Sequence, residues 1–412
     1  MPSSEAAGSD IRLADVAVIG GGLAGLQCAV RLVEARPQLS VLLLDPDPLG
    51  GCTKWAVGSF TAAGTGWQVR SGIDDTPAAH FEDLLLLCQF DGSADDEASY
   101  RELLMAMCDA GPELLDELSH RGVEFSGPYP EAPHRRPRMH NAVPSALSAA
   151  NALTAALDRS PKAQVVAEQM VDLAVDDRGF SVLTSGGTVL AQTLVIASGD
   201  RSASNPAVPA VNPRASGRPL ELLSSVLGAR LHTPQFAPGL RTFAVGKPLV
   251  APVGQLVRSG YVACGDRRVP GDEFLSDPAR FVGEDLHLET TAPGELASGF
   301  VCTFPGVGYA RLEDLERAGL ACRLTGAAGW RVGPMRVVIT LADGALDVDR
   351  EMRVLDVGGT PIEGLYACGT SALGGISLGG HGHHLLWAVA TGTVAARAIA
   401  KPAVSCSRGI AR

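Results

Sequence analysis

Residues 14–25 read ADVAVIGGGLAG, and this stretch determines the fold class. Ala14–Ile19 form a short apolar run, typical of a buried parallel strand, that stops at three glycines. Leu23–Ala35 then have helical character and end before Pro37, and Val41–Leu44 read as a second buried strand. Strand, glycine turn, helix and strand predict a right-handed βαβ unit at the start of an α/β fold.

The glycines of this turn fit the pattern G-x-G-x-x-G, and each has its own physical reason. Gly20 allows the tight turn, Gly22 lets the backbone approach a pyrophosphate, and Gly25 lets the helix pack on the strand. The helix N-terminus adds amides and a positive dipole end. Asp45 ends the second strand 20 residues after Gly25, where a carboxylate binds a ribose hydroxyl. The unit predicts a dinucleotide site without deciding between FAD and NAD.

The composition allows a large core and excludes several partners. A chain of 412 residues exceeds the usual single domain, so we expect about two domains. The net charge of −11 disfavours nucleic acid as a partner. Nine scattered cysteines, an odd number, favour free thiols and a cytoplasmic location. We expect no membrane span, because no apolar run reaches about 18 residues.

Later stretches of the chain add further helices and strands to the prediction. The patterns indicate helices over residues 94–120, 144–159 and 381–400, and strands over residues 165–175, 180–184, 188–190 and 194–197. Residues 46–66 are rich in Gly, Thr and Ala with poor periodicity, which is typical of a functional loop.

Four of these stretches resemble, in order, motifs of the fumarate reductase and succinate dehydrogenase flavoprotein family. Residues 49–59, LGGCTKWAVGS, resemble its G-G-N-T-K-x-A-x-G-G loop, which runs along the flavin ring. Residues 196–199, IASG, resemble its A-T-G-G strand end. Residues 364–369, GLYACG, are similar to its G-L-Y-A-A-G, and residues 378–380 to its L-G-G-N. The resemblance implies FAD as the cofactor and hydride transfer as the chemistry.

The same resemblance implies the domain organisation. We expect an α/β fold in which a Rossmann-like FAD-binding domain, residues 1–236 and 333–412, is interrupted by a smaller α+β capping domain, residues 237–332. A small-molecule substrate would lie between the two domains, over the flavin. No second G-x-G-x-x-G unit follows, so we expect no NAD(P)H domain, and the electron donor or acceptor stays unknown.

The resemblance and the glycine motif together give a set of expected cofactor-binding residues. They are Gly20, Gly22, Leu23, Ala24, Gly25, Asp45, Gly51, Cys52, Thr53, Gly58, Val171, Ser198, Gly199, Gly369, Thr370, Gly380, Gly382 and His383. Cys52 stands where the succinate dehydrogenase type carries a histidine bonded to FAD. Most relatives have Asn there and bind FAD non-covalently, which we expect here too.

The chain departs from the family at both substrate clamps. The clamp Arg falls on Ser377 and the clamp His on Ile339. We therefore expect an FAD-dependent dehydrogenase or reductase acting on an activated C–C bond, but not on a C4 dicarboxylate. An amine or amino-acid oxidase and a non-catalytic flavin-binding subunit are the alternatives.

Histidines supply the expected acid–base groups. His381, Gly382, His383 and His384 form an H-x-H-H cluster where the resemblance places a flavin-facing helix start. We predict His381 and His384 as catalytic candidates, together with His140 from the basic stretch that begins at residue 134. The cluster lacks the usual i, i+4 histidine pair, so we expect no metal there.

Overall fold

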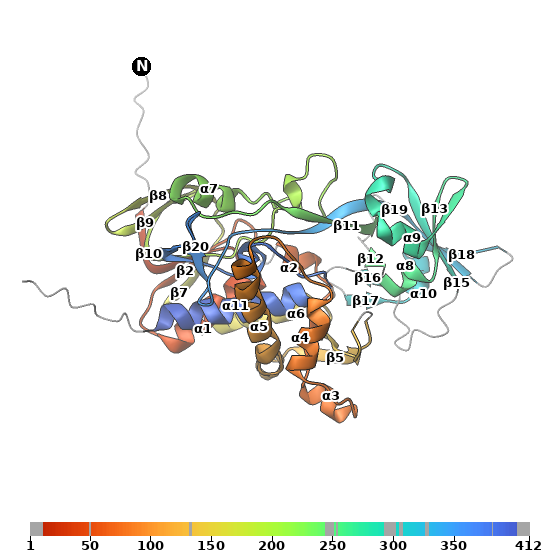
Figure 1. The fold of residues 1–412 in the computed structure, drawn as a ribbon, viewed down its shortest axis with the longest axis horizontal. Helices are drawn as coiled ribbons and strands as arrows, with labels where there is room; N and C mark the ends of the chain where they lie inside the picture. Colours follow the sequence, from red (N-terminus) through yellow and green to blue (C-terminus); the bar gives the residue numbers. More distant parts are fainter. Residues whose placement is uncertain are drawn as a thin grey trace, which may run out of the picture.

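The computed structural model describes residues 11–48, 51–131, 134–243, 251–252, 254–291, 302–304, 308–325, 329–380 and 382–401. A large α/β part fills one end of the long axis, and a smaller β-rich part fills the other (Figure 1). Within these ranges, no helix is both long and apolar enough to cross a membrane.

The main sheet is built around β1 (Ile11–Ile19), the strand that precedes the glycine turn. Two strands flank β1 in parallel, with Ile19 beside Ile196 on one side and Leu44 on the other. The strand order is β20 (Arg353–Leu355), β21 (Pro361–Ala367), β10 (Gly187–Ile196), β1, β2 (Val41–Leu44) and β7 (Ala163–Val166), with β9 (Gly179–Thr184) and β8 (Met170–Asp176) added beside β10. The carboxyl ends of β1 and β10 therefore meet at one edge, where such folds bind ligands.

Helices cover the sheet on the side of α1 (Leu23–Ala35). This helix packs between α11 (His383–Ala400) and α6 (Ala146–Leu157), and α1 and α11 lie side by side below the sheet (Figure 1). Close packing needs small residues, and a Cβ at Gly392 of α11 would lie 2.6 Å from the carbonyl oxygen of Ala24. The start of α1 is thereby held close against the middle of α11.

The remaining elements complete the large part. The long helix α5 (Ala94–His120) packs against α11 and α4 (Pro77–Leu85). The other elements of this part are α2 (Cys52–Trp55), α3 (Gly66–Arg70), α7 (Arg218–Leu227), the sheet of β3 (Ser59–Thr61), β6 (Met139–Val143) and β5 (Glu124–Tyr129), and the pair β4 (Gln89–Phe90) with β22 (Ile376–Ser377).

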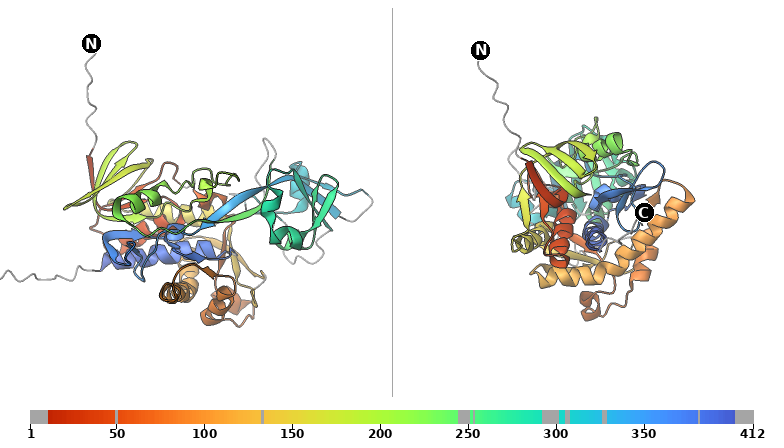
Figure 2. Two further views of the ribbon diagram at one scale, coloured as in Figure 1. Left: turned by 45° about the horizontal axis from the view of Figure 1, so that its top comes forward. Right: turned by 90° about the vertical axis from the view of Figure 1, so that its left-hand side faces the viewer.

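The smaller part is reached through two long antiparallel strands. They are β11 (Gln235–Thr242) and β19 (Gly329–Asp343), which run from the large part into the small one (Figure 2). Around them lie β15 (Leu286–Thr291), β13 (Tyr261–Cys264), β14 (Arg267–Pro270) and β18 (Ala321–Arg323), the three-stranded sheet of β12 (Ala251–Pro252), β16 (Cys302–Phe304) and β17 (Gly308–Ala310), and the helices α8 (Gly254–Arg258), α9 (Gly271–Ser276) and α10 (Leu312–Arg317).

The two parts have separate hydrophobic cores. One cluster of buried residues belongs to the large part, and a second runs from Leu240 to Val337 in the small part. The expected Rossmann-like fold with a capping domain is confirmed. We propose that the domain boundaries lie within a few residues of positions 237 and 332, because Met335 and Val337 of β19 still pack in the second core.

Three sequence expectations differ from the structure. The strands expected over residues 188–190 and 194–197 form one strand, β10, which ends at Ile196; the exposed Gln192 interrupts the apolar run but not the pairing with β1. The single strand expected over residues 165–175 is split into β7 and β8. Helix α11 starts at His383, with Gly382 as its N-cap at a φ of 83° that suits glycine.

Candidate active site

A cavity of about 440 Å³ opens beyond the carboxyl ends of β1 and β10. Its walls come from the glycine turn, from α2, from the start of α11 and from the strands β11 and β19 that lead into the capping domain. The predicted cofactor residues that line it are Gly20, Gly22, Leu23, Ala24, Asp45, Gly51, Cys52, Thr53, Gly58, Ser198, Gly199, Gly369, Thr370, Gly380 and Gly382. Residues from six separate stretches of sequence are thus brought to one site.

The turn before α1 has the shape that a pyrophosphate requires. Gly22 caps α1 without any side-chain hydrogen bond, and a Cβ there would meet only Thr53 Oγ1, at 3.5 Å. Gly51 and Gly199 have open space where a Cβ would stand. Thr53 Oγ1 accepts a hydrogen bond of 3.1 Å from the Leu23 amide, which ties the 51–58 loop to the turn. The open backbone at a helix N-terminus fits an anionic dinucleotide.

Asp45 stands at the far end of the turn, at the carboxyl end of β2. Its carboxylate accepts hydrogen bonds from the Gly21 amide at 2.6 Å and the Asp47 amide at 2.8 Å. Burial raises the pKa of Asp45, and these two amide hydrogen bonds act in the opposite direction. The carboxylate is held in place by backbone groups while it lines the cavity, as a ribose-binding acid must be.

Three predicted cofactor residues lie outside the cavity wall. Gly25 packs α1 on the sheet, since a Cβ there would lie 2.0 Å from the carbonyl oxygen of Gly20. Val171 is on β8 with 46% of its surface exposed. His383 is fully buried and faces His80 instead. Gly25 has the packing role that its place in the motif predicts, whereas the positions of Val171 and His383 argue against a direct contact with the cofactor.

The surroundings of His140 do not support the predicted catalytic role. His140 is fully buried on β6 and does not line the cavity. Its Nε2 hydrogen-bonds Thr65 Oγ1 at 2.8 Å, and its Nδ1 hydrogen-bonds the carbonyl oxygen of Arg138 at 2.7 Å. Burial lowers the pKa of His140 to about 4. Both ring nitrogens are engaged, so this histidine supports the fold. His381, the other expected catalytic residue at the H-x-H-H cluster, lies outside the described residues.

His384 is the predicted catalytic histidine that does line the cavity. Its Nε2 hydrogen-bonds Asp343 Oδ1 at 2.7 Å, and its Nδ1 makes no hydrogen bond with a described residue. Burial acts to lower the pKa of His384, but the charges of Asp343 and Asp200 and the hydrogen bond to Asp343 raise it overall. The ring is therefore fixed by a carboxylate on one side and faces the cavity from the other.

Asp343 is held in the charged state by its own partners. Its Oδ2 accepts from Ser377 Oγ at 2.8 Å and from the Leu378 amide at 3.1 Å. Burial acts to raise the pKa of Asp343, but His384 and these donors lower it overall. Ser377, which occupies the position of the family's clamp Arg, supports Asp343 here, and Ile339 at the other clamp position is a buried apolar residue.

Arg241 is the main residue that the sequence reasoning missed. It lies on β11, lines the cavity, and donates only to the carbonyl oxygen of Leu240, at 2.7 Å. Among the described residues no carboxylate pairs with it, and burial alone lowers its pKa to about 10. The available signal in the sequence was a cationic residue directly after the uncharged run of residues 236–240 in the same strand. Asp200 was also missed; its carboxylate accepts from Ser202 and from the Ala342 amide at 3.1 Å.

Comparisons with known proteins agree with an FAD-binding fold. Residues 15–219 match the family described as FAD binding domain. No curated protein matches the sequence. The fold is similar to the open conformation of a flavocytochrome c3 fumarate reductase, with a TM-score of 0.68 and 16% identity over 96% of this chain and 79% of that chain.

Two steroid dehydrogenases have the same fold. A 3-ketosteroid Δ1-dehydrogenase from Sterolibacterium denitrificans has a TM-score of 0.67 and 15% identity, over 94% of this chain and 99% of that chain. A 3-ketosteroid Δ4-(5α)-dehydrogenase from Rhodococcus jostii RHA1 has a TM-score of 0.61 and 19% identity, over 96% and 99%. The fold, the glycine turn and the cavity define an FAD-dependent oxidoreductase. Through residues 15–219 the chain belongs to the FAD binding domain family, as a member divergent in sequence.

Proposed function

We propose that this protein dehydrogenates or reduces an activated C–C bond in a small, mainly apolar molecule that carries one anionic group. Bound FAD supplies the N5 atom of its flavin ring as the hydride donor or acceptor. The observation that supports an anionic group on the substrate is Arg241, a cavity-lining cation with no carboxylate partner among the described residues. A charge taken out of water is stabilised best by an opposite charge with hydrogen bonds, which a substrate carboxylate provides.

His384 is the proposed proton donor or acceptor for the carbon atoms of the substrate. A C–C bond that gains or loses a hydride also gains or loses a proton, so a group in the cavity must exchange one. His384 lines the cavity, and the hydrogen bond from its Nε2 to Asp343 fixes the ring orientation. Asp343 is then a positioning residue, since it acts through the histidine.

The same site argues against a C4 dicarboxylate. Such a substrate needs charged partners at both ends, and both predicted clamp positions, Ser377 and Ile339, lack charge.

The surroundings of Cys52 in the same site support non-covalent binding of FAD. Burial and the charge of Asp200 raise the pKa of the Cys52 thiol, and the neutral thiol is a poor nucleophile toward a flavin.

The test replaces the guanidinium without removing its bulk. Holoprotein carrying Arg241→Met is titrated with benzoate and with benzamide, and binding is followed through the flavin absorbance. Loss of hydrogen bonds to a charged group costs about 1.5–3 kcal/mol, so the Kd for benzoate should rise about 10- to 100-fold. The affinity for benzamide, which has the same shape without the charge, should change little.

Arg336→Met is the matched control. Arg336 pairs with Arg241 across the two strands, but it is bound to Asp285 at 3.0 Å and does not line the cavity. Its removal should leave benzoate binding unchanged. Equal benzoate binding by wild type and Arg241→Met would refute the anionic substrate.

Neutral ligands test the competing substrate class. The Rhodococcus jostii enzyme was crystallised with 4-androstene-3,17-dione. If that steroid bleaches the flavin under anaerobic conditions and a panel of carboxylates does not, the substrate class proposed here is wrong. Hydrogen peroxide formed with amino acids would favour an oxidase, and a flavin that no compound bleaches would favour a non-catalytic subunit.

We also propose a reducing compartment for the protein. Seven cysteines of the described part of the chain are free thiols. Free thiols persist where glutathione and thioredoxin keep them reduced. Redox Western analysis of alkylated thiols from intact cells would test this.

A further inference from the structure

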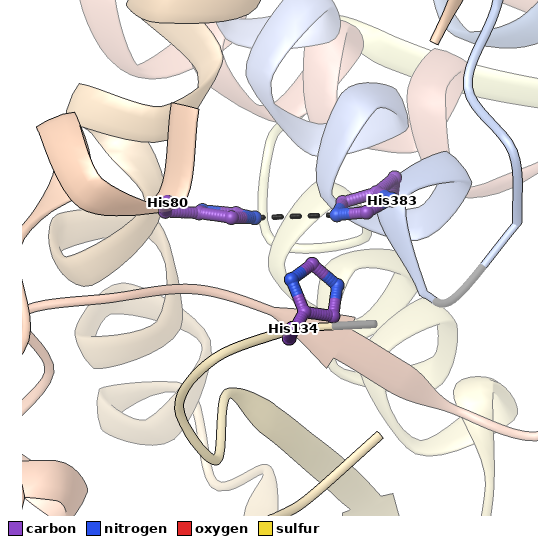
Figure 3. A group of neighbouring side chains, drawn as sticks. All are labelled: His80, His134 and His383. Carbon is purple, nitrogen blue, oxygen red and sulfur yellow. Dashed lines mark hydrogen bonds between the residues drawn. The ribbon is translucent and has the colours of Figure 1, made fainter. Parts of the chain in front are cut away.

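Three histidines from distant parts of the chain converge outside the cavity. They are His80 on α4, His134 in the loop before β6, and His383 at the first position of α11 (Figure 3). One ring nitrogen from each lies within 4.8 Å of the others. His80 and His383 are fully buried, and none of the three lines the cavity. The cluster is therefore separate from the candidate active site.

The rings are arranged with their nitrogens toward a common centre. His80 Nε2 and His383 Nε2 are 3.2 Å apart, and both rings point their nitrogen-bearing edges at each other (Figure 3). The His134 ring stands across them, at 62° to His80 and 66° to His383. In a tetrahedral zinc site with Zn–N bonds of about 2.0–2.1 Å, ligand nitrogens lie about 3.4 Å apart. The first pair is close to this spacing, and the His134 nitrogen, within 4.8 Å of the others, needs a shift of at most about 1.4 Å to reach it.

The charges around the cluster tolerate a cation. Arg138 Nη1 approaches His134 Nδ1 at 3.3 Å, which would compete with a metal for that nitrogen. Arg138 does not depend on this contact, because it is bound by Asp75 at 2.7 and 2.8 Å and by Asp83. Arg135 also binds Asp83, and it binds Glu82 as well, so three carboxylates face two guanidinium groups beside the cluster and leave excess negative charge there. His134 can therefore turn from Arg138 to a metal without leaving a buried charge unpaired.

We propose that His80, His134 and His383 bind one divalent transition-metal ion, with zinc as the best match and water as the fourth ligand. Neutral imidazole is a preferred ligand of zinc, and three histidines with one open position form a complete tetrahedral set. The ion would join α4 and the 134 loop to the first turn of α11. This departs from the expectation of no metal, which considered only the H-x-H-H stretch and not its partners elsewhere in the chain.

The experiment measures zinc in holoprotein that carries no polyhistidine tag. Wild type and the variants His80→Ala, His134→Ala and His383→Ala are incubated with zinc, passed over a desalting column and analysed for zinc and FAD. Wild type should retain about one zinc ion per chain. Each variant should bind zinc at least about 100-fold more weakly, since loss of an outer-shell partner alone can cost that much.

Two controls separate ligation from folding. His120→Ala removes an exposed histidine at the end of α5 and should leave zinc binding unchanged. His134 lies in a loop and is only partly buried, so His134→Ala should keep the FAD content and circular dichroism of wild type while losing zinc. Zinc should also raise the Tm of wild type in a concentration-dependent way, and not that of His134→Ala. Wild type that retains no more zinc than His134→Ala overturns the proposal, as does zinc uptake that all three variants keep.

Discussion

Two glycines of the same turn should respond to the same substitution in opposite ways. Gly25→Ala should destabilise the protein without FAD, because its Cβ would lie 2.0 Å from the Gly20 carbonyl oxygen and 3.1 Å from Ala197 Cβ. The nearer of these two atoms belongs to the backbone and cannot rotate away as a side chain could, so α1 must move by more than an ångström. Overpacking of this kind costs about 3 kcal/mol, and the better helix propensity of alanine returns about 1 kcal/mol. A net loss of about 2 kcal/mol should lower the Tm on the order of 5 °C.

Gly22→Ala should instead spare the fold and weaken FAD binding. The nearest atom to its Cβ is Thr53 Oγ1 at 3.5 Å, and the φ of −75° suits alanine, so the Tm of the apoprotein should stay within about 1 °C. The methyl group would occupy the space through which the backbone approaches the pyrophosphate. The Kd for FAD should rise at least tenfold, which corresponds to about 1.4 kcal/mol.

The assay uses apoprotein in both variants. Thermal unfolding gives the Tm without FAD, and quenching of FAD fluorescence on titration gives the Kd. Wild-type affinity in Gly22→Ala would mean that the dinucleotide does not approach this turn. A Gly25→Ala apoprotein as stable as wild type would mean that the contact of α1 with the sheet is looser than the structure has it.

Four further outcomes are expected. Acid precipitation should release all FAD into the supernatant, because the Cys52 thiol is held neutral; yellow pellets would contradict this. Fumarate should not reoxidise the reduced flavin in anaerobic stopped-flow experiments, since neither clamp position carries a charge. The variant His384→Gln should keep its FAD content, and its flavin should be reduced by the true substrate about 100-fold or more slowly than in wild type. The hydrogen bond to Asp347 raises the pKa of His232. The protonated His232 therefore stabilises the folded protein fully below about pH 6.5, and this stabilisation is lost as the pH rises through the raised pKa. Urea unfolding should show His232→Gln less stable than wild type at about pH 5.5 and nearly as stable at about pH 9.

The parts of the fold that depend on neighbouring residues could be predicted from the sequence. Helix α1 and strand β2 have the predicted bounds, because a glycine cluster and a proline mark their ends. The dinucleotide-binding fold was predicted for the same reason, since the turn between β1 and α1 must have glycine at fixed spacing. The resemblance to the flavoprotein family is confirmed by the family match.

Residues that meet only in the folded chain could not be predicted in this way. Arg241 lines the cavity from β11, and Asp343 on β19 binds His384, which lines the cavity; their local sequence does not show that the two long strands bring them to one site. The sequence predicts the H-x-H-H stretch only as one cluster at the start of a helix. In the structure, its partners come from α4, the 134 loop and β19, which are far away in sequence.

The first turn of α11 links the two histidine sites. Successive helix residues are rotated by about 100°, so His383 and His384 cannot face the same partner. His383 turns toward His80, while His384 turns toward Asp343 and the cavity. Gly382 before them is wedged against β3, where a Cβ would lie 2.7 Å from the Ser59 carbonyl oxygen. A metal on His383 would therefore fix the rotation of the same turn that aims His384, and the proposed metal acts on the reaction through the position of that ring and not through contact with the substrate.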